Sequence, residues 1–521
     1  MSFFKKLVKK DKDGSRSPKA SKGSPTSTRQ PNSPSTNDDE IEKFDEENMS
    51  NANMDMDAPE DKKRLWSRVS GLIGKDTMSL VSLPVYFFEP ITVLQAQVEP
   101  LRFVHLIEKA CEMENSLDRM CYITAFNISL FSSYVRTAKP FNPLLGETFE
   151  YIPKEGNYRT ICEQVSHHPP IGIAETTSSK FRLQQESHIT TKFWGNSVDI
   201  FSQGNNHLYL LDHDDYYSWK VPASCCHNIL LGRMWVEHHG TLSITNHKTG
   251  EKAIINFSKS SWFDGSTKKI TGEIFDSLGR KRFLVNGKWN ECVIITKLDD
   301  RGTKCDEFTI WKAQPDPEIE KNKWKLCKFI QSFNEMSEDY ESILPPTDSR
   351  LRPDRKYLEY GENKLANREK AKIEERERAK RKERELSGKK WEPKYFKRVD
   401  DPNFGSRWCY LENYWDQREQ RINKFRLNRS LKDLSITDIT DSDFSPKNPK
   451  TLDSPKSKNI EMIKHDNDKS ADQTFISSPK SNVTTYTTVY EKSSDQKPTS
   501  NSTTTTTTFV QQPSATGTSS N

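Results

Sequence analysis

Residues 241–257 read TLSITNHKTGEKAIINF, in which two segments of alternating apolar and polar residues flank a turn-forming run at 246–250. Segments with the same period of two continue from residue 158 to residue 311 without a helical pattern between them. Such consecutive antiparallel strands predict a closed or nearly closed sheet, because closure removes exposed edges, and a barrel of many strands encloses a cavity. The clearest strand segments are His188–Trp194, Val198–Phe201, Leu208–Leu211, Thr241–Thr245, Ala253–Phe257, Lys281–Val285 and Cys292–Lys297.

The composition divides the chain into a folded part and two polar ends. The 521 residues are 33% hydrophobic and 29% charged, with a mean hydropathy of −0.86, which is more polar than a wholly folded chain. The polar excess lies at the ends, which are rich in Ser, Thr, Asn, Pro and Lys. Aromatic residues recur between 391 and 415, so the fold extends to about residue 425. We therefore expect disordered tails at 1–61 and 426–521 and one domain over 62–425.

Charge and cysteine content exclude several classes of protein. A net charge of +5, from 79 basic and 74 acidic residues, argues against binding nucleic acid over a wide surface. The nine cysteines contain no C-x-x-C pair, and the chain shows no signal peptide, which indicates a reducing compartment. No apolar stretch is long enough to span a membrane. We expect a cytosolic monomer that contacts intracellular membranes peripherally.

Two segments near the N-terminus could have a role of their own, one as a binding peptide and one as an amphipathic helix. Glu42–Asp45 faintly resembles the acidic-aromatic peptides that endoplasmic-reticulum adaptors bind, although a solvated acidic linker is the favoured interpretation. Residues 62–76 carry apolar side chains at helical spacing among basic ones and predict a short amphipathic helix. Gly71 and Gly74 weaken it, as in a segment that moves, whereas permanent packing on the core is the alternative. Its apolar residues are Leu65, Trp66, Val69, Leu72 and Ile73.

Two further regions have helical patterns. Apolar residues at helical spacing recur between 101 and 136. The segment 362–385 has 17 charged residues among 24, ten of them basic and seven acidic, and only a narrow apolar stripe. Such a segment predicts a solvated helix that is stabilised by ion pairs four residues apart.

The octapeptide EQVSHHPP at 163–170 is the strongest candidate for a binding site. Neither proline has an N–H group, so the chain cannot continue a strand ladder and the two histidines lie at a rim. Adjacent histidines rarely bind one metal ion, and no nucleophile signature accompanies them. The remaining interpretation is that the two imidazoles bind an anion. The alternative is that the pair merely caps the end of a strand. The pair His238–His239 lacks the prolines and is expected to lie within a strand or turn.

A second candidate is the loop KPFNPLLGE at 139–147. Two prolines stiffen it, and it presents one ammonium and one amide group, which suit a phosphate and a hydroxyl. A tight turn without a binding role is the alternative.

These segments together resemble the lipid-binding domain of the oxysterol-binding protein family. The octapeptide is similar to the family's fingerprint, and the order of the other motifs agrees over about residues 62–425. The resemblance implies a mainly β (α+β) fold, in which a large incomplete antiparallel barrel encloses a lipid tunnel, with an N-terminal lid helix at about 62–76 and a helical C-terminal region. The matching motifs are 82–85 (SLPV), 89–90 (EP), 139–147, 163–170, 246–250, 347–354 (TDSRLRPD) and 412–415 (ENYW).

The resemblance also implies a function and a set of ligands. Members bind phosphatidylinositol 4-phosphate at the tunnel mouth and a second lipid, here expected to be a sterol, and exchange them between membranes. A lipid sensor with little transfer activity is the alternative, and an enzyme, a metal site or a cofactor is not expected. Arg350 and Arg352 also match a family motif, although ion pairs with Asp348 or Asp354 are the favoured interpretation. The implied headgroup ligands are Lys139, Asn142, His167, His168, Lys370, Glu374 and Arg378.

Overall fold

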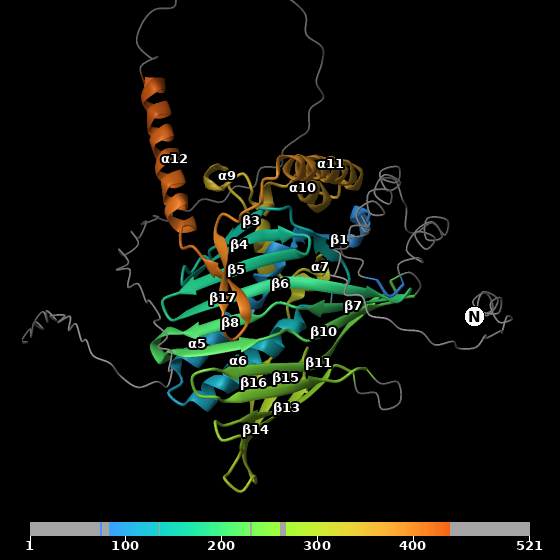
Figure 1. Ribbon diagram of the computed structural model, residues 1–521, viewed down its shortest axis with the longest axis vertical. Coiled ribbons are helices and arrows are strands. Elements are labelled where there is room, and N and C mark those ends of the chain that lie inside the picture. The colour runs from blue at the N-terminus through green and yellow to red at the C-terminus, as the bar shows by residue number, and fades with distance from the viewer. Residues whose placement is uncertain (1–72, 76–82, 135, 230–231, 261–266, 438–521) are drawn as a thin grey trace, which may run out of the picture. The chain divides into compact units, whose positions relative to one another are not determined.

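The computed structural model describes residues 73–75, 83–134, 136–229, 232–260 and 267–437. Its first half contains short helices and the long strands of the sheet (Figure 1). The elements up to residue 227 are η3 (Val85–Phe87), β1 (Phe88–Thr92), α4 (Val93–Ala96), η4 (Glu99–Phe103), α5 (Val104–Glu112), α6 (Ser116–Ser129), η5 (Leu130–Ser132), β2 (Lys139–Phe141), β3 (Thr148–Tyr151), β4 (Tyr158–His167), β5 (Pro170–Ser178), β6 (Phe181–Phe193), β7 (Ser197–Ser202), β8 (Asn206–Leu210), η6 (Leu211–His213), β9 (Asp215–Trp219) and β10 (Ala223–His227).

The second half completes the sheet and then becomes mostly helical. The remaining elements are β11 (Trp235–Asn246), β12 (Lys252–Phe257), β13 (Lys269–Phe275), β14 (Lys281–Lys288), β15 (Cys292–Leu298), β16 (Lys304–Lys312), α7 (Pro317–Lys321), α8 (Lys328–Gln331), η7 (Ser332–Asn334), α9 (Glu338–Ile343), η8 (Ser349–Leu351), α10 (Pro353–Glu359), α11 (Asn363–Ser387), β17 (Phe396–Asp401), β18 (Gly405–Tyr410) and α12 (Tyr414–Thr437).

Fourteen of the strands form one antiparallel sheet. Its main path is β16-β15-β14-β13-β12-β11-β10-β7-β6-β5-β4-β3, and β8 and β9 bridge a second route from β6 to β11. β6 pairs through residues 181–184 with β8 and through residues 189–193 with β7, so the sheet divides along this strand. The predicted fold class, mainly β with a large antiparallel sheet arranged as an incomplete barrel, is confirmed.

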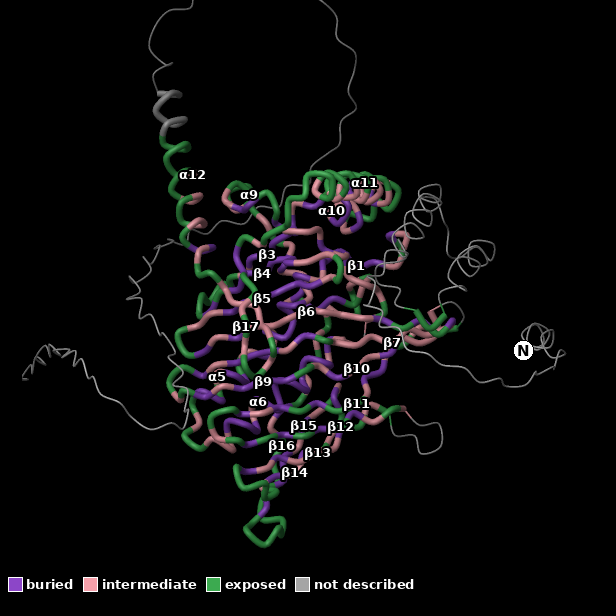
Figure 2. The backbone as a smooth tube through the Cα atoms, in the orientation of Figure 1, coloured by how far each residue is buried: buried purple, intermediate pink, exposed green. Residues whose placement is uncertain are grey.

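The quoted stretch 241–257 forms β11 and β12 as its alternation predicts. Leu242 pairs with Ile255 and Ile244 with Ala253, and all four side chains are buried. Along β12 buried residues alternate strictly with exposed ones, and the same alternation of colour is visible along the strands in Figure 2. The period of two arises because successive side chains of a strand point to opposite faces of the sheet.

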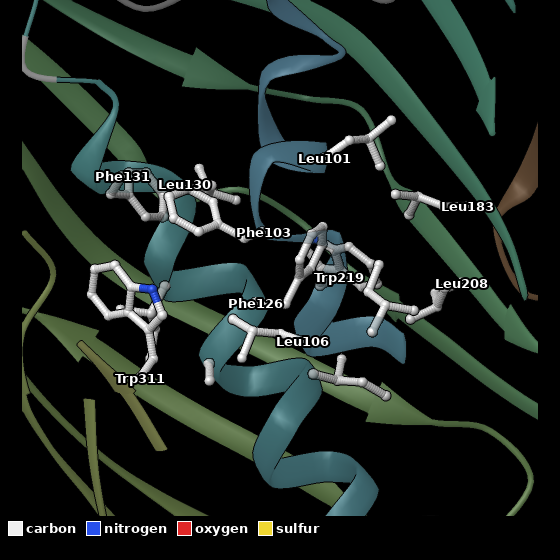
Figure 3. Close-up of a cluster of buried hydrophobic side chains, with 14 of the residues drawn as sticks. Leu101, Phe103, Leu106, Phe126, Leu130, Phe131, Leu183, Leu208, Trp219 and Trp311 are labelled. Carbon is white, nitrogen blue, oxygen red and sulfur yellow. The ribbon is translucent and has the colours of Figure 1, made fainter. Parts of the chain in front are cut away.

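Helices α5 and α6 lie against the sheet and supply much of the apolar core. Figure 3 shows Leu106 and Phe126 from these helices beside Trp219 and Trp311 from the strands. All four are buried, and each apolar side chain of this size contributes about 1.5–3 kcal/mol when it leaves water. The helices fall within the predicted region 101–136, and the Asn115 side chain caps α6 by accepting from two backbone N–H groups.

The charged segment forms the long helix α11. The helix ends where Gly388 adopts a φ of 64°, which a residue with a side chain rarely tolerates. Salt bridges three and four residues apart run along its surface, such as Lys372–Glu369 and Lys380–Glu377, as its composition predicts. Helix α12 runs through the expected domain end at residue 425 to Thr437. The expected tail at 1–61 and the second tail beyond residue 437 lie outside the described residues.

Candidate functional site

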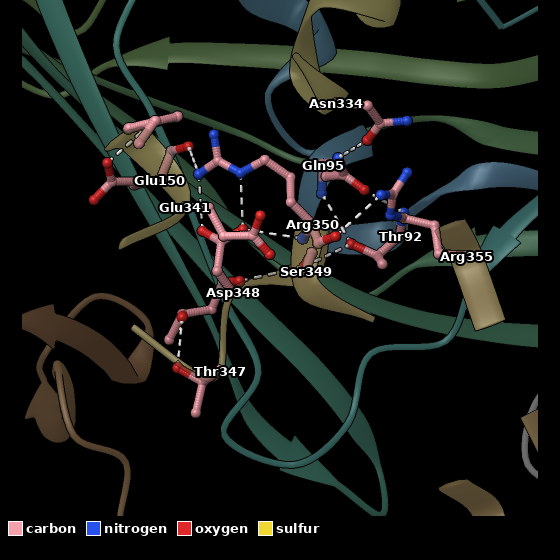
Figure 4. A network of polar contacts seen from close by, with 12 residues as sticks. Thr92, Gln95, Glu150, Asn334, Glu341, Thr347, Asp348, Ser349, Arg350 and Arg355 are labelled. Carbon is pink, nitrogen blue, oxygen red and sulfur yellow. Dashed lines mark hydrogen bonds and ion pairs between the residues drawn. The ribbon is translucent and has the colours of Figure 1, made fainter. Parts of the chain in front are cut away.

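Arg350 and Arg352 hold the mouth of the fold together rather than offering charge to a ligand. Arg350 donates from Nε and Nη2 to the two carboxylate oxygens of Asp348, at 2.8 Å each. Figure 4 shows this buried pair within a larger network that includes Thr92 and Ser349. Arg352 pairs with Asp354 at 2.6 Å and with Glu147 at 2.9 Å. The favoured interpretation of both arginines as structural ion pairs is confirmed.

The proline loop is fixed by these ion pairs. Arg352 Nη1 donates to the carbonyl of Asn142 at 2.8 Å, and the Glu147 carboxylate accepts from the Leu144 N–H at 2.9 Å. Gly146 has a φ of 77°, and a Cβ there would lie 2.6 Å from the Trp391 ring, so only glycine fits. The loop therefore presents Lys139 and Asn142 from a rigid frame.

Lys139 and Lys370 meet on one aromatic ring. The Nζ atom of each lies 5.7 Å from the centroid of the Phe88 ring in β1. Lys139 is placed there because β2 pairs in parallel with β1, with Lys139 opposite Phe88. Lys370 comes from α11 and forms an ion pair with Glu374 one turn further along the helix. Three of the predicted headgroup residues therefore converge, although Lys139 is more than 200 positions away from Lys370 and Glu374 in sequence.

The two histidines of the octapeptide lie at the turn between β4 and β5. Their ring centroids are 4.8 Å apart, with the ring planes at 75°. Burial above all, together with the neighbouring His168 and Arg381, lowers the pKa of His167 to about 4, while Glu377 and the Pro143 carbonyl act in the opposite direction. The Nδ1 atom of His167 is buried without a hydrogen-bond partner among the described residues. A buried polar nitrogen of this kind is costly to leave unpaired, which favours a polar ligand.

Helix α11 carries its three predicted residues on one side, and another arginine of the same helix contacts the histidines. Lys370, Glu374 and Arg378 are all half-buried, on the same side of the helix as the buried Ile373. Arg381, which the sequence analysis did not single out, lies 3.3 Å through Nη1 from Nε2 of His168. Eleven residues after Lys370, it is rotated by only about 20° around the helix. The spacing of eleven residues from Lys370 could therefore have pointed to Arg381 from the sequence alone.

A cavity lies behind this mouth. Its volume is about 490 Å³, and Lys139 and Pro140 form part of its wall. Most of the lining is apolar, but the Oε1 atoms of Gln97 and Gln185 are buried there without a hydrogen-bond partner among the described residues. Another part of the polar wall is a buried network, in which Arg136 pairs with Glu89 at 2.8 Å and with Glu99 at 2.6 Å. Typical apolar lining residues are Val93, Ala96, Phe131, Ile189, Val198 and Ile200.

Only the end of the predicted lid helix belongs to the described residues. Residues 73–75 form a turn, and Ile73 is 51% exposed. The Gly74 N–H donates to the Phe193 carbonyl at 2.7 Å, and the Phe193 N–H donates to the Lys75 carbonyl at 3.3 Å. Phe193 also lines the cavity, so this turn lies at the cavity wall. The other predicted lid residues, namely Leu65, Trp66, Val69 and Leu72, lie outside the described residues.

The sequence model of the oxysterol-binding protein family matches residues 64–419. The chain belongs to this family. It is 52% identical to oxysterol-binding protein 11 of Dictyostelium discoideum over 84% of this chain and 83% of that protein. It is 33% identical to human oxysterol-binding protein-related protein 2, over 68% and 82% of the two chains. Against human oxysterol-binding protein-related protein 1 the identity is 35%, over 68% of this chain but only 41% of that protein.

Solved structures of the family share the fold. The Osh1 ORD domain in complex with ergosterol has a TM-score of 0.64 and 35% identity, and the match covers 69% of this chain and 88% of that chain. The Osh3 ORD in complex with PI(4)P from Saccharomyces cerevisiae has a TM-score of 0.59 and 31% identity, with 69% and 93% covered. This is a family of lipid-binding proteins and not of enzymes. Within the described residues, no helix is both long and apolar enough to cross a bilayer.

Proposed function

We propose that this protein binds phosphatidylinositol 4-phosphate by its headgroup at the mouth, binds a sterol in the same cavity, and exchanges the two lipids between membranes. The observation that carries the proposal is the arrangement of Lys139. This residue belongs both to the basic mouth, where it shares the Phe88 ring with Lys370, and to the wall of the cavity. A lipid that is held by its headgroup there has an apolar space for its tails directly behind it.

The cavity also suits a sterol. A sterol needs an apolar wall and one or two polar groups for its hydroxyl, which the unpaired oxygens of Gln97 and Gln185 supply. Covering roughly 400 Å² of apolar lipid surface at about 25 cal/mol per Å² removes a penalty on the order of 10 kcal/mol, which explains why transfer needs an enclosed site. Relatives crystallised with ergosterol and with PI(4)P support both ligands.

The proposed headgroup ligands are Lys139, Asn142, His167, His168, Lys370, Glu374 and Arg378. Ammonium, guanidinium and imidazole groups bind the phosphates, and the Asn142 amide and the Glu374 carboxylate bind inositol hydroxyls. The protein would carry out this exchange at the surfaces of intracellular membranes, acting as a monomer and covered by the lid at about 62–76. The possible endoplasmic-reticulum adaptor of Glu42–Asp45 remains a prediction.

A lipid-exchange assay with the full chain tests the proposal. Donor liposomes carry a fluorescent sterol, and acceptor liposomes either contain or lack phosphatidylinositol 4-phosphate. We expect sterol transfer to be faster when the phosphoinositide is present, and Lys370→Ala to remove that acceleration. Lys382→Ala, an exposed lysine of the same helix, is the matched control and should behave like the wild type. Transfer that ignores the phosphoinositide would contradict the exchange, and no transfer at all would leave only the sensor hypothesis.

A further inference from the structure

Arg381 contacts the histidine pair although it lies outside the proposed set of headgroup ligands. Its Nη1 atom is 3.3 Å from Nε2 of His168, and the guanidinium also contributes to the low pKa of His167. Arg381 is half-buried and lies on the side of α11 that faces the mouth. Arg381 also forms a loose ion pair with Glu385 on the same helix, with Nε 3.8 Å from the carboxylate.

The contact determines the protonation of His168. A guanidinium group has only N–H donors and stays charged in proteins, so Nε2 of His168 must accept. That nitrogen therefore carries no proton, and the imidazole is neutral, with its proton on Nδ1. A protonated His168 would have to give up this hydrogen bond and would face the Arg381 cation across a short distance.

The contact is also a weak one for an arginine. A neutral imidazole offers one acceptor atom, whereas a phosphate offers several charged oxygens in a geometry that a guanidinium matches with two parallel hydrogen bonds. The acidic groups nearby are already engaged, because Glu377 pairs with Lys380 and Arg376, and Glu374 pairs with Lys370. A phosphate that enters beside the histidines is thus the better partner for Arg381.

We propose that Arg381 is a further headgroup residue, which holds His168 neutral while the site is empty and turns to the phosphate when a phosphoinositide headgroup binds. Nε2 of His168 is then released from Arg381 and lies beside an anion, so the imidazole takes up a proton, and headgroup binding adds two charge-assisted contacts at once. The inference rests on the proposed function, since it assigns a new role within the same headgroup site.

Three variants of the full chain separate charge from hydrogen bonding. Arg381→Ala removes both, Arg381→Gln keeps an N–H donor for His168 without the charge, and Arg381→Lys keeps the charge without the planar fork. Lys382→Ala is the control, because Lys382 is exposed on the same helix. The probe is glycerophosphoinositol 4-phosphate, which carries the headgroup without the tails. Affinity is measured by calorimetry at pH 7.5 and pH 6.0, and the His168 titration is followed by NMR.

We expect Arg381→Ala and Arg381→Gln each to weaken headgroup binding by about tenfold or more, since each loses a charge-assisted hydrogen bond. Arg381→Lys should retain part of the affinity. The His168 titration should move to higher pH in Arg381→Ala but much less in Arg381→Gln. The wild type should also take up more of a proton on binding than Arg381→Ala, so its affinity should rise more steeply than that of the variant as the pH falls from 7.5 to 6.0. Sterol binding should be unchanged in all variants, which verifies that they are folded.

Each outcome decides a separate question. If the wild type does not bind the probe, the proposed function fails and not only the role of Arg381. If the wild type binds and Arg381→Ala binds equally well, the inference about Arg381 alone is overturned. An unmoved His168 titration in Arg381→Ala likewise overturns the claim that Arg381 keeps this histidine neutral.

Discussion

His167–His168 and His238–His239 are both adjacent histidine pairs in the same sheet, but they lie in different surroundings. His167 ends β4 at the mouth, where Arg381 and the proline loop approach. His238 lies inside β11, as the fourth residue of that strand, with its ring 4.6 Å from the Phe131 ring and 4.7 Å from the Trp289 ring. Its Nδ1 atom is 2.8 Å from the Ser224 hydroxyl on the neighbouring strand. The second pair was expected to lie in a strand or turn, and the strand is confirmed.

The comparison shows that a perturbed pKa does not by itself reveal a binding role. Burial lowers the pKa of His167 and of His238 to about 4 in each case. Each ring also has one buried nitrogen without a hydrogen-bond partner among the described residues. The neighbours are what differ, because a cationic side chain and a rigid polar loop approach His167, whereas His238 lies among aromatic rings at the cavity wall. An anion would be attracted to the first environment and repelled by the desolvation cost in the second.

The largest effect is expected from removing the first pair. His167→Ala/His168→Ala should reduce affinity for glycerophosphoinositol 4-phosphate about 100-fold, because two hydrogen bonds to a charged group are lost. The free energy of unfolding should stay within about 1 kcal/mol of the wild type, since the pair lies at a rim. His238→Ala should leave this affinity unchanged. Calorimetry with the soluble headgroup measures both, and equal losses in the two variants would remove the distinction between the pairs.

The converse variant tests the second pair. His238→Ala should lower the free energy of unfolding by about 2–3 kcal/mol, because it leaves a cavity among aromatic rings and an unpaired Ser224 hydroxyl. Urea denaturation measures this loss. His105→Ala, which removes an exposed histidine of α5, is the control and should change stability by less than about 0.5 kcal/mol. A destabilisation of His238→Ala no larger than that of the control would contradict a structural role.

Much of this arrangement could be predicted from the sequence, because it follows from local patterns. Alternation over residues 241–257 predicted two paired strands, and the charge pattern of 362–385 predicted α11. The structural pairing of Arg350 with Asp348 was likewise readable, since the two residues are only two positions apart. Such features depend on neighbours along the chain, where strand period, helix period and short-range ion pairs operate.

The rest depends on contacts between distant segments. Arg381 meets His168 across 213 positions, and nothing local indicates that this turn of α11 faces the β4–β5 turn. The pairing of Arg136 with Glu89 and Glu99 in the cavity wall was missed for the same reason, as these residues come from separate elements. Burial of the Glu99 carboxyl, only partly offset by Arg136, raises its pKa to about 7, a consequence that no sequence pattern carries.

The pH dependence of stability sharpens the comparison between the pairs. Both rings have a folded pKa below the ordinary 6.5, so the unfolded chain takes up protons first as the pH falls. Their contribution to stability is therefore complete above about pH 6.5 and is lost as the pH falls towards 4, on the order of 2 kcal/mol for the nearly fully buried His238. Carboxylates also lose stabilising interactions as the pH falls. The difference in the free energy of unfolding between wild type and His238→Phe, measured by urea denaturation at pH 7.0, 5.5 and 4.5, therefore isolates the part of the loss that comes from His238.

The headgroup should separate the two contributions. A bound anion favours the protonated form of His167 and should leave His238 unaffected. Saturating glycerophosphoinositol 4-phosphate should therefore reduce the acid-induced loss of stability that comes from His167–His168, and not the loss that comes from His238. The share removed by His238→Phe should be the same with and without the headgroup. If the headgroup altered that share, the two sites would be coupled and the contrast drawn here would be wrong.

The smallest effect concerns the hydroxyl that orients His238. Ser224→Ala removes the partner of Nδ1 and leaves the ring in its aromatic surroundings, so the free energy of unfolding should fall by about 1 kcal/mol. The loss is smaller than in His238→Ala because no large cavity forms. In the double variant the two losses should not add, since without the imidazole the Ser224 hydroxyl has already lost its partner. Strictly additive losses in a double-mutant cycle would mean that the hydroxyl and the ring stabilise the strand independently, and that packing alone holds the second pair in place.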